Sequence, residues 1–227
     1  MSCTRTQGII IHVNTKAGDH VSEKIIICGS GPASKEKLQP CLEDVDYIIA
    51  ADGGYERLNE MGLKADLVCG DMDSIRSTPE DVKKINYPPE KDRSDMQLCL
   101  DYVFTNFTTI SEIIVTGALS EERFDHSLAN IFMFFQYNMN ITVIAPHMKM
   151  YVINKSGGYN FRAQVGTTVS VLSTWGGEIF GEGLKYNLDG KLKHPSHGIS
   201  NIATSEDIKI CVDEGKWAIM FLDSVDN

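Results

Sequence analysis

The chain has 227 residues, of which 42% are hydrophobic and 23% charged, so it can bury one large core or two small ones. These proportions exclude a fully disordered chain, a collagen-like fibre and a disulfide-stapled miniprotein. Acidic residues outnumber basic ones by 31 to 21, which gives a formal net charge of −10. A protein with this charge repels polyanions, so the composition argues against a general binder of nucleic acid or anionic membranes.

The six cysteines indicate a reducing compartment. No two of them form the Cys-x-x-Cys pair that binds zinc or carries redox chemistry, and they stand at positions 3, 28, 41, 69, 99 and 211. The N-terminal segment lacks a signal-peptide cleavage pattern, and no apolar run approaches the roughly 20 residues of a membrane span. We therefore expect a cytoplasmic protein, and we assign no role to residues 1–23.

Short apolar runs alternate with amphipathic stretches from Lys24 to about Ala145. The apolar runs predict strands, and the 3.6-residue spacing of apolar side chains predicts helices between them. Strands are expected at 24–28, 46–52, 65–71, 112–117 and 140–146, and helices at 34–42, 53–61, 96–107 and 124–135. This alternation favours a doubly wound, mostly parallel sheet with helices on both faces.

The pattern changes after Pro146, where glycine-rich turns separate short runs rich in Val, Thr, Tyr and Trp. Runs of this kind are typical of antiparallel strands. They lie at 150–161, 167–174, 178–188 and 207–222. The predicted fold class is therefore α/β, with an α/β domain at 24–146 followed by an antiparallel β-sandwich-like domain at 147–227.

Acidic residues stand where the predicted strands end. Asp52 closes one strand, and Asp71 and Asp73 close the next. Two further groups open predicted helices: Asp92 with Asp95, and Arg123 with Asp125 and His126. Ligands bind outside the carboxyl ends of parallel strands, and these ends share one edge of the sheet. Carboxylates gathered there repel one another without a hard cation, so the pattern points to Mg²⁺, which prefers oxygen ligands.

Each of these residues has a simpler structural explanation when taken alone. Asp52 before two glycines could be a turn residue and helix cap, and Asp95 could likewise cap its helix. His126 could be a satisfied, half-buried side chain. The pair Asp71 and Asp73 is harder to explain in this way, because two carboxylates at one strand end are costly without a counter-charge. The argument rests on the convergence of all these groups at one edge.

Three other phosphate-related motifs match less well. The loop 29–35 lacks the second glycine of a P-loop and has Glu36 at the hydroxyl position. The same loop has Ser34 in place of the third glycine of a dinucleotide fingerprint, and Pro32 interrupts it. The pair Asp71-x-Asp73 is similar to the aspartyl-phosphate motif of haloacid-dehalogenase-like phosphatases. A Mg-dependent phosphohydrolase with Asp71 as nucleophile therefore stays an alternative.

Six short motifs, in order and at plausible spacing, resemble those of the thiamine pyrophosphokinase family from about residue 25 to the C-terminus. They are 52–54 (Asp-Gly-Gly), 70–75 (Gly-Asp-Met-Asp-Ser-Ile), 91–95 (Lys-Asp-Arg-Ser-Asp), 117–119 with 123–130, 183–186 (Gly-Leu-Lys-Tyr) and 200–201 (Ser-Asn). The resemblance implies transfer of pyrophosphate from ATP to the hydroxyl of thiamine, with AMP as the other product. It also implies a homodimer in which the β domain contributes to the thiamine site and the dimer interface.

The resemblance also implies roles for individual residues. Asp71, Asp73 and Asp95 would hold Mg²⁺, and Asp71 or Asp95 would accept the hydroxyl proton. The ATP site would comprise Asp52, Gly53, Gly54, Lys91, Asp92, Arg123, Asp125, His126 and Asn130, with Lys91 and Arg123 on phosphate oxygens. The thiamine site would comprise Tyr186, Ser200 and Asn201, because an aromatic face suits a cationic ring.

Two departures from the family pattern stand out. The usual Gly-Ala-x-Gly-Gly-Arg turn is replaced by a turn with Ser120, Glu121 and Glu122 before Arg123, and Ile202 stands where an acid often follows Ser-Asn. Tyr186 could instead be a core residue of the β domain. A nucleotide- or thiamine-binding module without catalysis is a further alternative, although such a module has less need of three clustered acids.

Overall fold

The computed structural model describes residues 22–73, 82–88, 90, 92–173 and 176–223. These residues divide into two compact units, one that ends at Val152 and one that begins at Ile153. The first unit contains strands and helices, and the second contains strands and one short 3₁₀ turn. The predicted fold class is therefore confirmed. The contacts divide the chain inside the strand that follows Pro146, a few residues beyond the boundary expected from the sequence.

The strands of the first unit form a mostly parallel arrangement. Their spatial order is β7-β6-β5-β1-β2-β3-β4, and only β7 runs antiparallel to its neighbour β6. β1 therefore lies in the middle, between β5 and β2, and pairs with both of them in parallel. The strands are β1 (Glu23–Cys28), β2 (Tyr47–Ala51), β3 (Leu67–Gly70), β4 (Lys83–Asn86), β5 (Ile110–Thr116), β6 (Ile141–Ala145) and β7 (Met148–Ile153).

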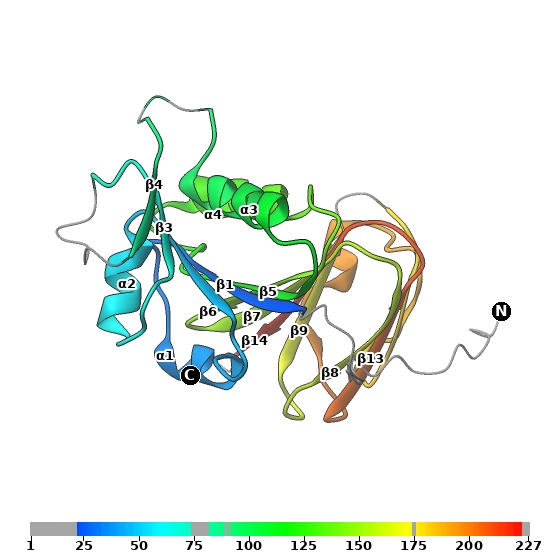
Figure 1. The fold of residues 1–227 in the computed structure, drawn as a ribbon. Coiled ribbons are helices and arrows are strands. Elements are labelled where there is room, and N and C mark those ends of the chain that lie inside the picture. Colours follow the sequence, from blue (N-terminus) through cyan, green and yellow to red (C-terminus); the bar gives the residue numbers. More distant parts are fainter. Residues whose placement is uncertain (1–21, 74–81, 89, 91, 174–175, 224–227) are drawn as a thin grey trace, which may run out of the picture. The chain divides into compact units, whose positions relative to one another are not determined.

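Helices cover both faces of these strands, as Figure 1 shows, with α3 and α4 on one face and α1 and α2 on the other. Successive residues of a strand point to opposite faces, so Ile26 and Cys28 of β1 pack with Leu38 of α1 and Leu58 of α2 in one core. The helices are α1 (Lys35–Leu38), α2 (Gly54–Glu60), α3 (Asp95–Asn106) and α4 (Phe124–Phe134). None of the helices in the described ranges has the length and hydrophobicity needed to span a bilayer.

The segment predicted as one helix at 34–42 is divided in two. Ser34 caps α1 by accepting a hydrogen bond from the Lys37 N–H, but α1 ends at Leu38 after four residues. A 3₁₀ turn (Gln39–Cys41) follows, with Pro40 in its first positions. Proline has no N–H to donate to the preceding turn, so it cannot continue the helical hydrogen-bond pattern.

The strand β4 is absent from the sequence prediction. Three of its four residues are exposed, and it pairs only with β3 among the described strands. An exposed strand at the edge of a sheet has no buried apolar face, so it leaves no apolar run in the sequence.

The second unit contains two antiparallel groups of strands. One has the order β12-β9-β14 and the other the order β11-β10-β13-β8. The rings of Phe161 and Phe221 lie 5.4 Å apart and join the two groups. The strands are β8 (Gly157–Arg162), β9 (Thr168–Ser173), β10 (Ile179–Glu182), β11 (Leu188–Gly190), β12 (Asn201–Ile202), β13 (Asp207–Val212) and β14 (Trp217–Leu222), and a 3₁₀ turn covers Pro195–Gly198.

The cysteines of the described residues are free thiols, at positions 28, 41, 69, 99 and 211. Cys28, Cys69 and Cys99 are fully buried. Burial raises the pKa of Cys28 to about 12, because the apolar surroundings disfavour the thiolate. These three cysteines therefore act as small hydrophobic side chains.

Candidate functional site

The chain turns sharply from β2 into α2 at Asp52. This residue has φ of 45°, in the left-handed region that few residues other than glycine adopt. Its backbone N–H donates to the Cys69 carbonyl (2.8 Å), and its carbonyl accepts from the Tyr55 N–H (3.0 Å). A Cβ atom at Gly70 would lie only 2.8 Å from the Asp52 Cβ, so β3 needs glycine at its end. Together these contacts hold the Asp52 carboxylate beside the end of β3.

Three carboxylates meet at this edge. Asp52, Asp71 and Asp73 each offer an oxygen, and these oxygens lie within 4.8 Å of one another. Met72 between the last two has φ of 65°, and the Asp73 N–H donates to Asp71 Oδ1 (3.4 Å). Asp52 Oδ1 is buried and has no hydrogen-bond partner among the residues that the structure describes. A buried carboxylate oxygen without a donor is costly unless a cation or water binds it.

This donor set fits Mg²⁺. The ion is bound in proteins through a few carboxylate oxygens, and it keeps waters or substrate phosphates in its other positions. Asp52 supplies a buried oxygen, whereas Asp71 is half-buried and Asp73 exposed, so the group has one wall in the protein and one side toward solvent. The group differs from the set predicted from the sequence, since it contains Asp52 and does not include Asp95.

Asp95 is the first residue of α3. Ser94 caps this helix by accepting a hydrogen bond from the Gln97 N–H (3.2 Å), so Asp95 is not the cap residue. Its side chain is half-buried, and a carboxylate in the first turn is favoured by the helix dipole. Asp92 is exposed, and Lys91 lies outside the described residues.

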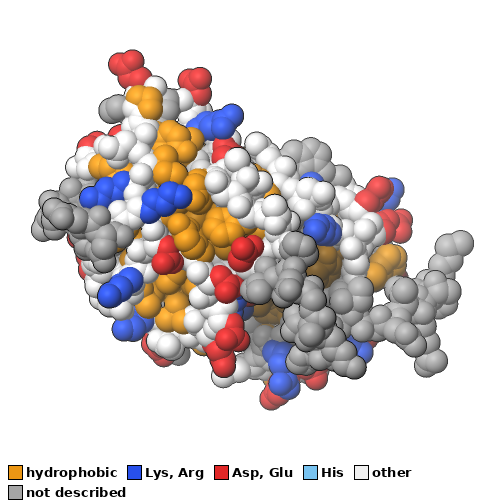
Figure 2. Space-filling view, viewed as in Figure 1, with side chains coloured by type: hydrophobic (Ala, Val, Ile, Leu, Met, Phe, Trp, Pro, Cys, Tyr) orange, Lys and Arg blue, Asp and Glu red, His pale blue; other side chains and the backbone are white. Residues whose placement is uncertain are grey.

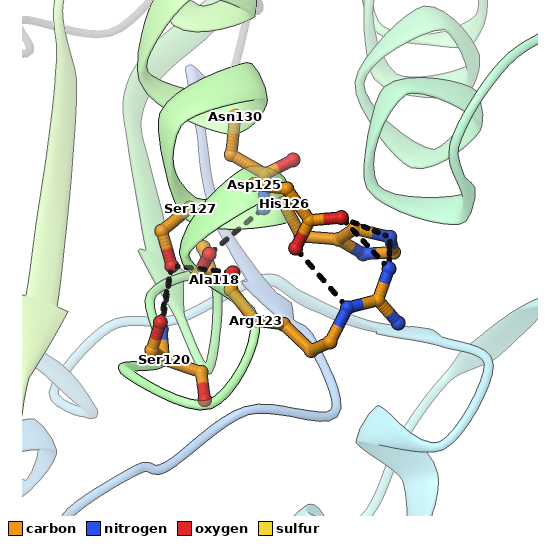
Figure 3. A network of polar contacts seen from close by, with 7 residues as sticks. All are labelled: Ala118, Ser120, Arg123, Asp125, His126, Ser127 and Asn130. Carbon is orange, nitrogen blue, oxygen red and sulfur yellow. Dashed lines mark hydrogen bonds and ion pairs between the residues drawn. The ribbon is translucent and has the colours of Figure 1, made fainter.

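A polar network surrounds the start of α4 (Figure 3). The guanidinium of Arg123 donates to both carboxylate oxygens of Asp125 at 3.1 Å, and it also contacts the His126 ring. All three side chains are more than half exposed. Asp125 therefore limits the orientation of the Arg123 guanidinium, whose fork faces solvent, where a phosphate could reach it.

Two side chains of α4 fix the turn that precedes it. The Ser127 hydroxyl accepts from the Ser120 N–H (2.7 Å) and lies 2.8 Å from the Ser120 carbonyl, to which it can donate. Asn130 Nδ2 donates to the Ala118 carbonyl (2.8 Å), as Figure 3 shows. The turn with Ser120, Glu121 and Glu122 is therefore held by side chains where the family pattern has glycines. Asn130 uses its amide here on the backbone of the turn.

The loop after β1 is tied to the end of β5. The Gly29 N–H donates to the Thr116 carbonyl (2.8 Å), and the Gly31 N–H donates to the Gly117 carbonyl (2.9 Å). A phosphate loop needs such N–H groups pointing at the ligand, and these two are already bonded. The geometry therefore agrees with the rejection of a P-loop at 29–35.

Gly54 has a packing role. A Cβ atom at this position would lie 1.9 Å from the Cys28 carbonyl oxygen, so only glycine allows α2 to begin against the end of β1. The family resemblance placed Gly53 and Gly54 in the ATP site. The close approach that the structure shows at Gly54 is between two parts of the chain itself.

The residues predicted to bind thiamine lie in the second unit. Tyr186 is 61% exposed, so it is not a core residue, and Lys185 Nζ lies 5.6 Å from the centre of its ring. Ser200 is exposed and has φ of 57°. Asn201 is only 3% exposed, and its carboxamide makes hydrogen bonds to the backbone of Tyr186.

Comparison with known families gives a match over the segment that carries the acidic group. Residues 38–145, which include Asp52, the acidic pair after β3 and the network of α4, match the family model of the thiamin pyrophosphokinase catalytic domain. This segment of the chain is therefore similar to a thiamin pyrophosphokinase catalytic domain. The resemblance stated from the sequence is confirmed, and the pyrophosphokinase interpretation is favoured over a phosphohydrolase with Asp71 as nucleophile.

Solved structures share the fold over 89% of this chain. The thiamin pyrophosphokinase of Geobacillus thermodenitrificans superposes with a TM-score of 0.75 at 24% identity, over 89% of this chain and 99% of that one. The thiamine pyrophosphokinase of Bacillus subtilis superposes with a TM-score of 0.73 at 20% identity, over 89% of this chain and 100% of that one. The thiamin pyrophosphokinase of Candida albicans superposes with a TM-score of 0.68 at 16% identity, over 89% of this chain and 90% of that one. The comparison with curated protein sequences gives no match.

Two features of the structure differ from the roles that the resemblance implied. The resemblance placed Asp52 in the ATP site and not among the residues that hold Mg²⁺, and it gave Ser127 no role. A signal for Ser127 exists, because a serine in the first turns of a helix often bonds to nearby backbone groups. The grouping of Asp52 with Asp71 and Asp73 depends on backbone angles that the residue types do not encode.

We expect Arg123→Ala to raise the pKa of Asp125. The hydrogen bond from Arg123 is the main reason why this carboxyl has its pKa lowered from 3.8 to about 2. The folded-state pKa is the lower one, so the pair stabilises the fold above about pH 3.8 and this contribution is lost as the pH falls toward 2. Carboxyl NMR titration of both proteins measures the shift. If the titration midpoint of Asp125 stays near pH 2 in the variant, a group other than Arg123 stabilises the charged carboxylate.

Proposed function

We propose that this chain is a thiamine diphosphokinase, which transfers the terminal pyrophosphoryl group of ATP to the hydroxyl of thiamine. The products are thiamine diphosphate and AMP. The observation that carries this proposal is the catalytic-domain match, since residues 38–145 contain the acidic group and Arg123. The hydroxyl oxygen forms a bond to the β-phosphorus of ATP, and the bond from this phosphorus to the α-phosphate oxygen breaks.

The acidic group of Asp52, Asp71 and Asp73 is our candidate for binding Mg²⁺. The buried oxygen of Asp52 supports this assignment, as does the closeness of the three carboxylates. When bound, Mg²⁺ neutralises charge on the phosphate oxygens, which is the main requirement of phosphoryl-transfer catalysis. The family resemblance placed Asp95 with Asp71 and Asp73 as residues that would hold Mg²⁺. We now propose Asp95, alongside Asp71, as a candidate to accept the proton of the thiamine hydroxyl.

Arg123 is our candidate for binding the phosphates. Asp125 accepts two hydrogen bonds from its guanidinium and so limits the orientations of the fork. A planar guanidinium held in this way can donate to two phosphate oxygens at once. Lys91 is proposed for the same task on the family resemblance alone, because it lies outside the described residues.

Tyr186 and Ser200 are our candidates for binding thiamine. The exposed aromatic face of Tyr186 suits a cationic ring, and Ser200 has a hydroxyl that can bond to the neutral pyrimidine. Thiamine and ATP are thus expected to use different residues of the chain.

The direct test is incubation of the purified protein with Mg-ATP and thiamine. We expect equimolar AMP and thiamine diphosphate, and no AMP when thiamine is omitted. Release of inorganic phosphate without thiamine, together with a trapped aspartyl-phosphate at Asp71, would replace the proposal by the phosphohydrolase alternative. Binding of both ligands without any product would favour the binding module.

Substitutions should separate the two substrates. We expect Tyr186→Ala and Ser200→Ala to weaken thiamine binding by about fivefold to tenfold, and to leave the affinity for ATP within about twofold. Arg123→Ala should do the reverse, because a charged hydrogen bond to phosphate is lost. Separate titrations with thiamine and with a non-hydrolysable ATP analogue measure this. Equal shifts of both affinities in all three variants would contradict the division into two substrate sites.

We also propose a homodimer that works in the cytoplasm. The family resemblance suggests the dimer, and three apolar side chains of α4 give it a surface to bury, since Phe124, Leu128 and Phe132 are all exposed. Figure 2 shows a hydrophobic area, part of which lies over α3 and α4. Sedimentation at assay concentration should give twice the mass of the chain. A fully active monomer would contradict the dimer.

A further inference from the structure

Two segments of the second unit pair near the exposed Tyr186. Leu184 forms an antiparallel bridge with Ala203, the Lys185 N–H donates to the Ile202 carbonyl (2.8 Å), and the Thr204 N–H donates to the Gly183 carbonyl (2.8 Å). In this register Lys185 lies opposite Ile202. The residue after Lys185 therefore lies opposite the residue before Ile202, which places Tyr186 opposite Asn201. Opposed residues in an antiparallel ladder alternate between hydrogen-bonded and non-bonded pairs, so Tyr186 and Asn201 fall at a non-bonded position.

The carboxamide of Asn201 supplies the bonds that the backbones do not make there. Its Oδ1 accepts from the Tyr186 N–H (2.9 Å), and its Nδ2 donates to the Tyr186 carbonyl (2.6 Å). The same Oδ1 also accepts from the Ile202 N–H (2.9 Å), so both of its acceptor positions are used. The residue is buried, which strengthens hydrogen bonds by keeping water away.

The neighbouring Ser200 is held by a second side chain. Its backbone N–H donates to Ser170 Oγ (3.1 Å), and its φ of 57° turns the chain just before Asn201. Asn201 is thus tied at one end to the backbone of Tyr186 and at the other is covalently joined to Ser200. The two exposed side chains that the proposed function assigns to thiamine are connected through this one buried residue.

We propose that Asn201 is a positioning residue for thiamine recognition and not a thiamine ligand. Its carboxamide fixes the backbone of Tyr186 next to Ser200, so that ring and hydroxyl are presented together before the substrate arrives. Preorganisation of this kind improves binding, because Tyr186 and Ser200 are already ordered in the free protein. The entropy cost of ordering them therefore does not reduce the binding free energy. This inference rests on the proposed function, and it places the thiamine-binding contacts on Tyr186 and Ser200 alone.

The first experiment compares Asn201→Ala with the matched variant Asn187→Ala, at an exposed asparagine next to Tyr186. We expect Asn201→Ala to raise the thiamine KM by about tenfold, equivalent to ~1.4 kcal/mol. The ATP KM should stay within about twofold, and Asn187→Ala should change neither value. A similar rise in both KM values for Asn201→Ala would show a general structural role and overturn the proposal.

The second experiment repeats the Asn201 substitution in a Tyr186→Ala background. If Asn201 acts through Tyr186, the second substitution should raise the thiamine KM by less than about twofold more. A further tenfold rise would show that Asn201 contacts the substrate independently, and it would overturn the positioning role. Absence of thiamine-dependent AMP release in the unmodified protein would instead contradict the proposed function, and that outcome is separate from both.

A third measurement needs no variant and no activity. Amide hydrogen exchange of the unmodified protein should be slower at Tyr186 than at Asn187, because only the Tyr186 N–H is bonded to a buried carboxamide. Equal exchange rates at the two amides would contradict the hydrogen bond on which the proposal depends. This readout keeps the proposal testable even if Asn201→Ala does not fold.

Discussion

Asp71→Asn and Asp73→Asn are each expected to lower turnover by at least about 100-fold, which corresponds to about 2.7 kcal/mol of barrier. Each substitution removes one negative charge from the group of three carboxylates that we assign to Mg²⁺. The fold should survive, because relief of repulsion between like charges at this edge offsets the local contacts that are lost. Steady-state kinetics over a range of Mg²⁺ concentrations, with thermal unfolding of each variant, measure both effects.

The matched control is Asp189→Asn, which makes the same change of charge at an exposed residue of β11. It should leave turnover and its Mg²⁺ dependence unchanged. Near-normal activity of the Asp71 or Asp73 variant at limiting Mg²⁺ would remove that residue from the metal site. Loss of the folded state would make the residue structural.

Gly54→Ala should lower the free energy of unfolding by about 3 kcal/mol. The new Cβ would lie 1.9 Å from the Cys28 carbonyl oxygen and 2.7 Å from the Cys28 carbonyl carbon. Both atoms belong to the backbone of a central strand, which cannot move aside as a flexible side chain could. Denaturant unfolding gives the change directly, and the Tm of the protein should fall by roughly 6–12 °C.

Gly158→Ala in β8 is the control for this prediction. A Cβ atom there meets nothing within 4 Å, so the substitution should leave stability unchanged or raise it slightly. If Gly54→Ala keeps the enzymatic activity of the unmodified protein, α2 can shift without disturbing the acidic group of Asp52, Asp71 and Asp73. A stability of Gly54→Ala equal to that of the unmodified protein would contradict the packing role of Gly54.

The central strands could be predicted because their signal is local. Ile25, Ile26, Ile27 and Cys28 are consecutive and all fully buried, as expected for a parallel strand covered on both faces. The exposed edge strand β4 leaves no such run and was missed. The helix expected at 34–42 was too long, because the interruption at Pro40 was not weighed against the apolar spacing.

The candidate site was predictable in its residue types and less so in its grouping. That Asp52 and Asp71 lie at one edge follows from parallel strands, whose carboxyl ends share an edge. That Asp52 belongs with Asp71 and Asp73 follows from its positive φ and from the space at Gly70, which only the structure shows. Asn201 is similar, because the sequence identifies a polar residue and cannot show that its hydrogen bonds are directed inward.

The central position of β1 has a consequence for synthesis of the chain. β1 needs β2 on one side and β5 on the other, yet about 65 residues separate the end of β2 at Ala51 from the end of β5 at Thr116. At a translation rate of roughly 5–20 residues per second, the edge of β1 that pairs with β5 lacks its partner strand for roughly 3–13 s. The unpaired backbone groups of such an edge are a template for aggregation, especially in an apolar strand. The nascent chain should therefore bind a chaperone most strongly at Ile25–Cys28, and should release it once Thr116 has left the ribosome.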